Sequence, residues 1–88
     1  MTESDLAKIK FRFVMSMSGK YEHMLSYESV DHIPTIEICI HTPVRKDGTF
    51  GREYRYYGFN GNVYKTKKKF IEAMTEFEEE SKDKFRKI

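Results

Sequence analysis

Apolar and polar residues alternate one for one near the start of the chain, and this alternation is the strongest constraint on the fold. A repeat of two sustained over ten residues is typical of a β-strand with one buried face. The pattern predicts a strand over residues 8–17 with five apolar side chains on one face: Ile9, Phe11, Phe13, Met15 and Met17.

Two more strands are predicted by the same alternation, over residues 21–27 and 36–40. The segment 18–20 (Ser-Gly-Lys) has turn chemistry, and Pro34 lies in the break before the third strand. Every second residue from 36 to 40 is isoleucine, which favours a buried inner face because β-branched side chains suit a pleated surface.

A fourth strand is predicted over residues 50–57, between turns at 45–48 and 58–61. Its aromatic residues fall on both faces of the strand. The pattern therefore leaves open which pair of side chains faces the core, Tyr54 and Tyr56 or Arg55 and Tyr57.

The last part of the chain is expected to be a helix that begins after Thr66. Phe70, Met74 and Phe77 recur at helical spacing, and threonine is a favoured N-cap residue. Phe85 extends this apolar stripe. Cations suit the C-terminal end of a helix dipole, and four are found there: Lys82, Lys84, Arg86 and Lys87.

Short connections between the strands predict an α+β fold of order β-β-β-β-α, in which four strands form an antiparallel meander. The helix is expected to pack on one face of this sheet, over the rows of Ile9, Leu25 and the isoleucines, and to leave the other face open. Residues 1–88 then form a single domain. Residues 1–6 are expected to be loosely ordered, although 2–5 have the residue types of a helix cap.

Composition excludes several classes of protein. Charged residues make up 34% of the chain but the net charge is only +2, which argues against a histone-like polycation and an acidic nucleic-acid mimic. Cys39 is the single cysteine, so no disulfide can form within the chain. No signal peptide or long apolar run is present, so we expect a soluble, cytoplasmic protein that does not bind membranes.

Charge is distributed unevenly along the chain. Between residues 45 and 69 eight basic residues stand against two acidic ones, a local charge of +6, whereas residues 70–80 carry five Glu and no base. Interleaved cations and aromatic rings suit nucleic acid, since cations contact phosphates and rings stack on bases. The candidate nucleic-acid-binding residues are Arg45, Lys46, Arg52, Tyr54, Arg55, Tyr56, Tyr57, Lys65, Lys67, Lys68 and Lys69.

Lys67, Lys68 and Lys69 fall where the first turn of the helix is expected, and cations there oppose the helix dipole. A phosphate bound jointly by these lysines and the free N–H groups would resolve the conflict. The alternative is a solvated face, in which Lys68 pairs with Glu72 and cations on the strands face acidic residues across the sheet, namely Glu22, Glu28 and Glu37.

The second half of the chain resembles the double-stranded-RNA-binding domain. In that family a three-stranded sheet is followed by a helix whose N-terminus presents lysines to phosphates across a groove, and residues 65–69 occupy the comparable place here. The resemblance implies RNA as the ligand. The chain departs from the family in opening with a predicted strand instead of a helix, and in lacking its small-residue pattern at the helix start.

The spacing of residues gives little support to a metal site or an enzyme. Cys39 and His41 share a strand face, but the chain has no CxxC or HxxxH spacing. A small ribonuclease would need His23 or His41 as general base, and no partner residue is implied for either. We expect no metal, no cofactor and no catalytic residue.

Two functions stay open. The first is a non-enzymatic module that binds nucleic acid, RNA in preference, through the candidate residues. The second is a protein-binding inhibitor or adaptor using the same tyrosines and arginines, because Tyr and Arg anchor protein interfaces. In general style the chain is similar to small accessory proteins of large bacterial viruses, which often block host defence enzymes or toxins. An open sheet face or edge strand also allows a homodimer.

Overall fold

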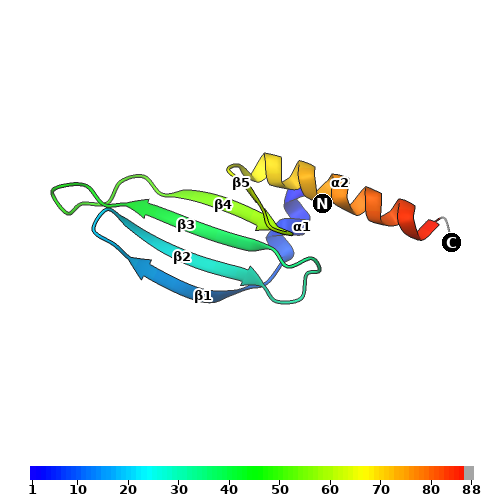
Figure 1. Cartoon of the computed structure of the whole chain (residues 1–88), viewed down its shortest axis with the longest axis horizontal. Helices are drawn as coiled ribbons and strands as arrows, with labels where there is room; N and C mark the ends of the chain where they lie inside the picture. Colours follow the sequence, from blue (N-terminus) through cyan, green and yellow to red (C-terminus); the bar gives the residue numbers. More distant parts are fainter. Residues whose placement is uncertain (87–88) are drawn as a thin grey trace.

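A five-stranded antiparallel meander followed by a long helix forms the protein (Figure 1). The computed structural model describes the backbone of residues 1–86 and the side chains of residues 1–82. Its elements are α1 (Glu3–Lys8), β1 (Phe11–Ser18), β2 (Glu22–Ser29), β3 (Glu37–Pro43), β4 (Tyr54–Phe59), β5 (Asn62–Tyr64) and α2 (Lys67–Arg86). The predicted α+β class, antiparallel meander and C-terminal helix are confirmed, while α1 and β5 are additional elements.

β5 exists because the turn after β4 is tighter than predicted. Only Asn60 and Gly61 connect the two strands, and both have positive φ angles, 51° and 80°. Positive φ at both positions of an Asn-Gly pair is the geometry of a type I′ hairpin turn. Phe59 consequently pairs with Asn62 and belongs to β4 instead of a loop.

A β-bulge in β1 shows that the predicted single apolar face of this strand is wrong. Phe13 pairs with Tyr27, but the next paired residue is Met15, opposite Ser26, so Val14 is an extra residue in the strand. One extra residue shifts the alternation by one position. Phe13 therefore lies on the face that α2 covers, whereas Met15 lies on the opposite face, together with Met17.

The core lies between one face of the sheet and the two helices. Its buried apolar residues are Leu6, Ile36, Tyr57, Phe59, Phe70 and Met74. The ring of Phe70 meets those of Tyr57, Phe59 and Tyr64 at centroid separations of 5.6, 5.8 and 6.3 Å. Phe77 also packs against the core, so the predicted stripe of Phe70, Met74 and Phe77 is confirmed. Phe85 and the cations Lys84, Arg86 and Lys87 lie outside the residues whose side chains are described.

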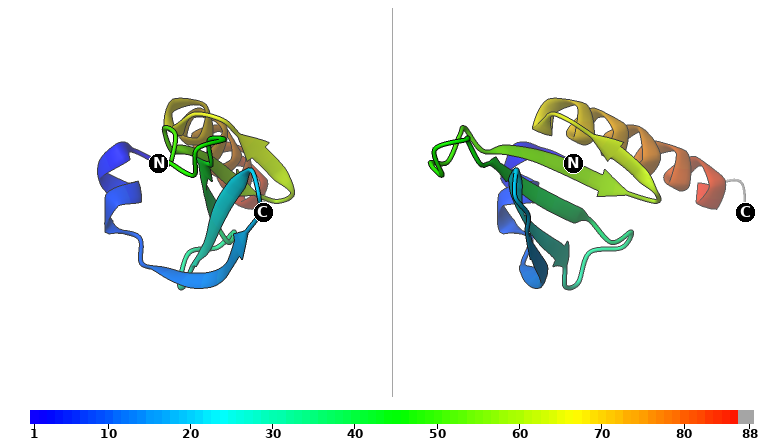
Figure 2. Two further views of the ribbon diagram at one scale, coloured as in Figure 1. Left: turned by 90° about the vertical axis from the view of Figure 1, so that its left-hand side faces the viewer. Right: turned by 60° about the vertical axis from the view of Figure 1, so that its left-hand side comes forward.

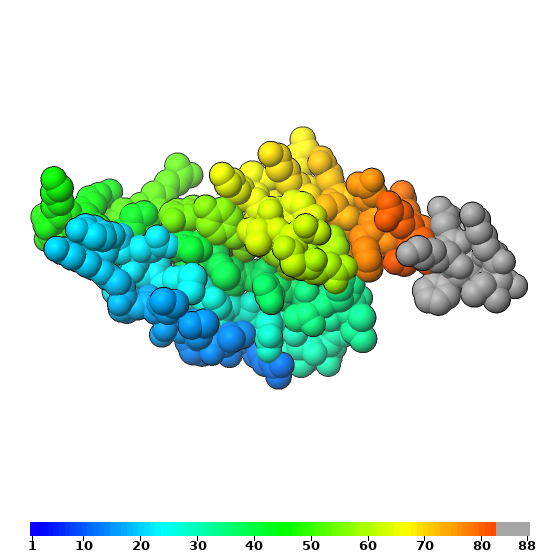
Figure 3. Space-filling model, viewed as in Figure 1, coloured from blue at the N-terminus to red at the C-terminus, as the bar shows by residue number. Residues whose placement is uncertain are grey.

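α2 covers only the β4–β5 side of the sheet. The end of the sheet that carries the β1–β2 turn and the β3–β4 loop extends past the N-terminus of α2 (Figures 1 and 2). The molecule is accordingly elongated, about 60 × 23 × 21 Å. Leu25 was expected beneath the helix but is 38% exposed beyond it. The other face of the sheet has no helix over it, and α1 is hidden behind the sheet in Figure 3. Neither helix, as far as its residues are described, is long and apolar enough to cross a membrane.

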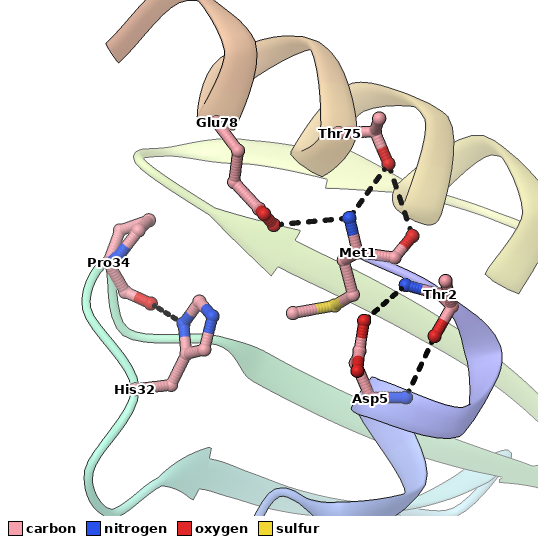
Figure 4. Close-up of polar contacts among 7 residues, drawn as sticks. All are labelled: Met1, Thr2, Asp5, His32, Pro34, Thr75 and Glu78. Atoms are coloured by element: carbon pink, nitrogen blue, oxygen red, sulfur yellow. Dashed lines mark hydrogen bonds and ion pairs between the residues drawn. The ribbon is translucent and has the colours of Figure 1, made fainter. Parts of the chain in front are cut away.

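The N-terminal residues form the short helix α1, which includes part of the segment 1–6 that was expected to be loosely ordered. Thr2 and Asp5 cap α1 reciprocally: each side chain accepts a hydrogen bond from the other's backbone N–H, at 3.1 and 2.9 Å. The ammonium group of Met1 donates to Thr75 Oγ1 at 3.0 Å and pairs with Glu78 at 3.3 Å (Figure 4). These contacts attach α1 to α2.

Replacing Leu6 by alanine is expected to lower the free energy of unfolding by about 2–3 kcal/mol, because a buried leucine leaves a cavity when it is truncated. Leu6 is only 7% exposed and is the buried residue of α1. Urea denaturation measures the change. Leu25→Ala is the matched control, and because this leucine is 38% exposed its loss should stay below about 1 kcal/mol. Equal losses in the two variants would contradict the docking of α1 on the core.

Candidate nucleic-acid interface

The outer edge of β4 is only partly covered by β5. β5 pairs with Tyr57, Gly58 and Phe59, so no described strand pairs with the outer edge of residues 54–56. From this open segment the chain leads at one end to the β3–β4 loop and at the other to the start of α2. We call the following set the β4 edge: Arg45, Lys46, Arg52, Tyr54, Arg55, Tyr56, Lys65, Lys67, Lys68 and Lys69. The segments that carry it form the upper margin of Figure 3, from green at the left to yellow near the centre.

The β3–β4 loop holds Arg45 and Lys46 at one end of the β4 edge, where both are exposed. The N–H of Arg45 donates to the carbonyl of Thr49 at 2.8 Å. The Asp47 carboxylate accepts hydrogen bonds from the hydroxyl and the N–H of Thr49, at 2.6 and 3.0 Å. These bonds hold the pKa of Asp47 below its usual value. The loop is thus a defined turn that presents two cations.

The start of α2 holds the lysines at the other end of the β4 edge. The Thr66 hydroxyl accepts a hydrogen bond from the N–H of Lys69 at 3.1 Å, which confirms Thr66 as the N-cap. The first turn contains no acidic residue and begins with three lysines, residues 67–69, all exposed. Since the N-terminal end of a helix carries a partial positive charge, these lysines add to a local potential that favours an anion.

The middle of the β4 edge presents different groups on the two sides of the sheet. Arg55 lies on the same side as α2, beyond its N-terminus, and pairs with Glu53 at 3.2 Å. Tyr54 and Tyr56 lie on the uncovered side. An aromatic group and a guanidinium group thus flank the open backbone from opposite directions.

Tyr57 lies in the core, away from the surface on which the sequence analysis placed it. It is 7% exposed, and its ring stacks on Phe70 at a centroid separation of 5.6 Å. The reason is the alternation of β4 itself: Tyr57 shares a face with Phe59, and both pack beneath α2. Tyr57 is therefore a structural residue, and the other ten candidates lie on the β4 edge.

A histidine and a carboxylate that the sequence did not pair adjoin Tyr54 and Tyr56. The carboxylate of Glu22 accepts a hydrogen bond from Nδ1 of His41. The His41 ring stacks on Tyr54 at a centroid separation of 5.0 Å and an interplanar angle of 6°, and meets Tyr56 edge-on at 5.1 Å. We call Glu22, His41, Tyr54 and Tyr56 the His41 cluster. The sequence alone indicates that His41 lies on a strand, and that Tyr54 and Tyr56 share a face of the next strand. The β3–β4 register then places His41 opposite Tyr54.

The phenol of Tyr54 is expected to ionise above the ordinary tyrosine pKa of about 10. Partial burial raises the pKa of Tyr54, and the negative charge of Glu22 adds to this effect. Subtracting the ultraviolet titration of Tyr54→Phe from that of the wild type isolates the group. Glu22→Gln should lower the pKa of Tyr54, since it removes the repelling charge; an unchanged titration would contradict the arrangement. Because the pKa is raised, the stability linked to the neutral phenol is present below pH ~10 and is lost at higher pH.

Three ion pairs form among the described side chains and the N-terminus: Met1–Glu78, Arg12–Glu28 and Arg55–Glu53. The contact of Glu22 with His41 is a fourth ion pair only when the imidazole is protonated. Arg12–Glu28, at 2.6 Å, is one of the cross-strand pairs that the solvated-face alternative anticipated. The anticipated pair of Lys68 with Glu72 is not among them. Of the eight basic residues between 45 and 69, seven make no ion pair with any side chain of residues 1–82.

The three histidines lie in separate places. Nδ1 of His23 contacts the Ser18 hydroxyl at 2.9 Å, and Nδ1 of His32 contacts the Pro34 carbonyl at 2.7 Å. Within the part of the chain that the structure describes, no three His, Cys, Asp or Glu side chains are grouped closely enough to hold a metal ion. Each histidine therefore makes its own separate contact.

No family model matches the chain, and no similar protein is found among the curated proteins or the solved structures. Like the double-stranded-RNA-binding domain, the protein opens with a helix, but its sheet has five strands where that family has three.

Proposed function

We propose that this protein is a non-enzymatic module that binds nucleic acid, RNA in preference, along the β4 edge. The observation that supports the proposal best is the placement of its cations: they follow one open edge of the sheet from the β3–β4 loop to the start of α2. Seven of these eight basic groups have no ion-pair partner among the described side chains. A polyanion would supply the missing counter-charges.

Each part of the β4 edge has a role in this proposal. The lysines at residues 65–69 contact phosphates, helped by the positive end of α2. Arg45 and Lys46 contact phosphates further along the same strand of nucleic acid. Between them a β-strand rises about 3.3 Å per residue, so the strand segment from Tyr54 to Tyr56 adds roughly 7 Å and the whole edge accommodates several nucleotides.

Exposed aromatic rings are the reason for preferring RNA. Tyr54 is 40% exposed beside the open edge, and Tyr56 lies next to it on the same face. Aromatic rings of this kind stack on unpaired bases, and RNA offers such bases in its loops and single strands. His41 holds the ring of Tyr54 by parallel stacking, which lowers the entropy lost when a base is bound.

Fluorescence anisotropy with labelled single-stranded RNA, hairpin RNA and duplex DNA tests the proposal. At about 25 mM salt we expect binding that weakens at about 200 mM, because phosphate contacts release counterions. The hairpin and single-stranded RNA should bind more tightly than the duplex. No detectable binding of any of the three at low salt would show that the proposal is wrong.

A second candidate is a protein-binding inhibitor or adaptor, and the His41 cluster is the observation that favours it. Half-exposed tyrosines on an uncovered sheet face are typical anchors of protein interfaces. A pull-down from bacterial lysate before and after nuclease treatment separates the two candidates. Capture of the same protein after nuclease treatment, lost in Tyr54→Ala, would favour the second.

A further inference from the structure

The two outer edges of the sheet differ in how well they are protected from pairing with another chain. Natural proteins protect exposed edge strands by short length, charged side chains, proline or bulges. The β4–β5 side has a three-residue strand and the cations Arg52, Arg55 and Lys65. β1, on the other side, is eight residues long and has no charged residue or proline from Phe13 to Ser18.

Apolar side chains of β1 are exposed on both faces of the sheet. Phe13 is 56% exposed on the α2 side. Val14, Met15 and Met17 are 49%, 44% and 55% exposed, and Met15 and Met17 lie on the uncovered face. Val14 and Met15 also line a shallow hollow of about 200 Å³ on that face. A free edge with these residues leaves both unpaired backbone groups and apolar surface in contact with water.

We propose that β1 pairs with β1 of a second copy of this chain, antiparallel and about a two-fold axis, to give a continuous ten-stranded sheet. A second copy of β1 is the partner that the charges favour. Residues 13–18 are uncharged, so pairing this stretch with itself places no like charges opposite one another. A two-fold axis also relates a strand to its own antiparallel partner, so the assembly closes at two copies. Head-to-tail pairing of β1 with the other edge is opposed by the shortness of β5.

The bulge at Val14 limits the contact without preventing it. A bulge protects an edge locally by bending the strand, and here it lies in the first half of β1. The second half, Met15 to Ser18, pairs regularly with β2 and leaves a regular outer edge. One strand buries less than the ~800 Å² per partner of a standard interface, so we expect a dissociation constant on the order of micromolar.

Sedimentation velocity over about 1 to 500 µM tests the proposal, a range chosen around the expected affinity. The wild type should change from a 10.5 kDa monomer to a species of twice that mass. Val14→Lys/Met17→Lys should stay monomeric at the highest concentration. Val63→Lys is the matched control: Val63 is 68% exposed on β5, at the opposite edge, so this variant should dimerise like the wild type.

Circular dichroism checks that each variant is folded. Should the double variant lose its fold, Ser16→Lys provides the same test from one exposed polar position in β1, with an expected weakening of at least tenfold. A wild type that is monomeric throughout, β1 lysine variants that dimerise normally, or a mass that grows beyond two copies would each overturn the proposal. The dimer keeps both β4 edges at its outer margins, so the β1 lysine variants should bind RNA at low protein concentration like the wild type.

Discussion

The triple variant Lys67→Glu/Lys68→Glu/Lys69→Glu is expected to lose nucleic-acid binding by at least about 100-fold at low salt. It replaces three cations with three anions where α2 begins, so phosphates are repelled from one end of the β4 edge. With about 0.7 counterions released per phosphate of a single strand, three lost contacts should reduce the salt slope of log K by about 2. Fluorescence anisotropy at several salt concentrations measures both quantities.

The same variant should be more stable than the wild type. Glutamate in the first turn of a helix interacts favourably with the dipole where lysine interacts unfavourably, and each exchange contributes about 0.3–1 kcal/mol. A total of about 1–3 kcal/mol corresponds to a rise in Tm of roughly 4–24 °C for a domain of this size. A variant that gains stability while it loses binding cannot have lost binding through unfolding.

A charge-matched control separates the β4 edge from net charge. Lys8→Glu/Lys10→Glu/Lys82→Glu changes the charge by the same amount at three exposed positions away from this edge. It should retain most of the affinity. Equal losses in the two triple variants would show that binding depends on overall charge, and the β4 edge would then have no special role.

The second large effect is expected for Phe70→Ala, which should lower the free energy of unfolding by about 3–5 kcal/mol. Phe70 has no exposed surface and joins α2 to rings on β4 and β5. Small domains have a total stability of about 5–15 kcal/mol, so this loss leaves little of it. Urea denaturation measures the change, and RNA binding should weaken with it because α2 no longer holds its lysines beside β4.

Phe50→Ala is the control for this substitution. Phe50 is 59% exposed, and among residues 1–82 its ring meets one other aromatic ring, that of His23, at a centroid separation of 5.3 Å. Its loss should cost less than about 1 kcal/mol. Similar costs for Phe50→Ala and Phe70→Ala would contradict the position of the core beneath α2.

The strands β2 to β4 and the helix α2 could be predicted because their signals are local. Alternation over five to seven residues for β2 and β3, turn residues on either side of the fourth strand, and Phe70, Met74 and Phe77 at helical spacing involve only neighbouring residues. Thr66 caps α2 through its own hydroxyl, again a local contact. The Asn60-Gly61 pair carried a hairpin signal as well, but β5 is too short to show a period of its own.

The bulge and the attachment of α1 to the core could not be predicted in this way. Phe13 and Met15 continue an apparently unbroken alternation, and only pairing with β2 reveals that Val14 is an extra residue. α1 is attached through contacts of Met1 with Thr75 and Glu78, which lie more than 70 residues away in the chain. Such contacts have no trace in the local pattern.

The candidate site likewise has features that local sequence predicts and features that depend on the fold. Residue types and their order along the chain were sufficient to establish an uneven charge distribution, a strand–helix boundary rich in lysine, and tyrosines interleaved with arginines. The three-dimensional fold decided that Tyr57 is buried, that Tyr54 stacks on His41, and that the cations follow one open edge. Burial and neighbourhood depend on strand register and on where a helix docks, and both arise from contacts between residues distant in the chain.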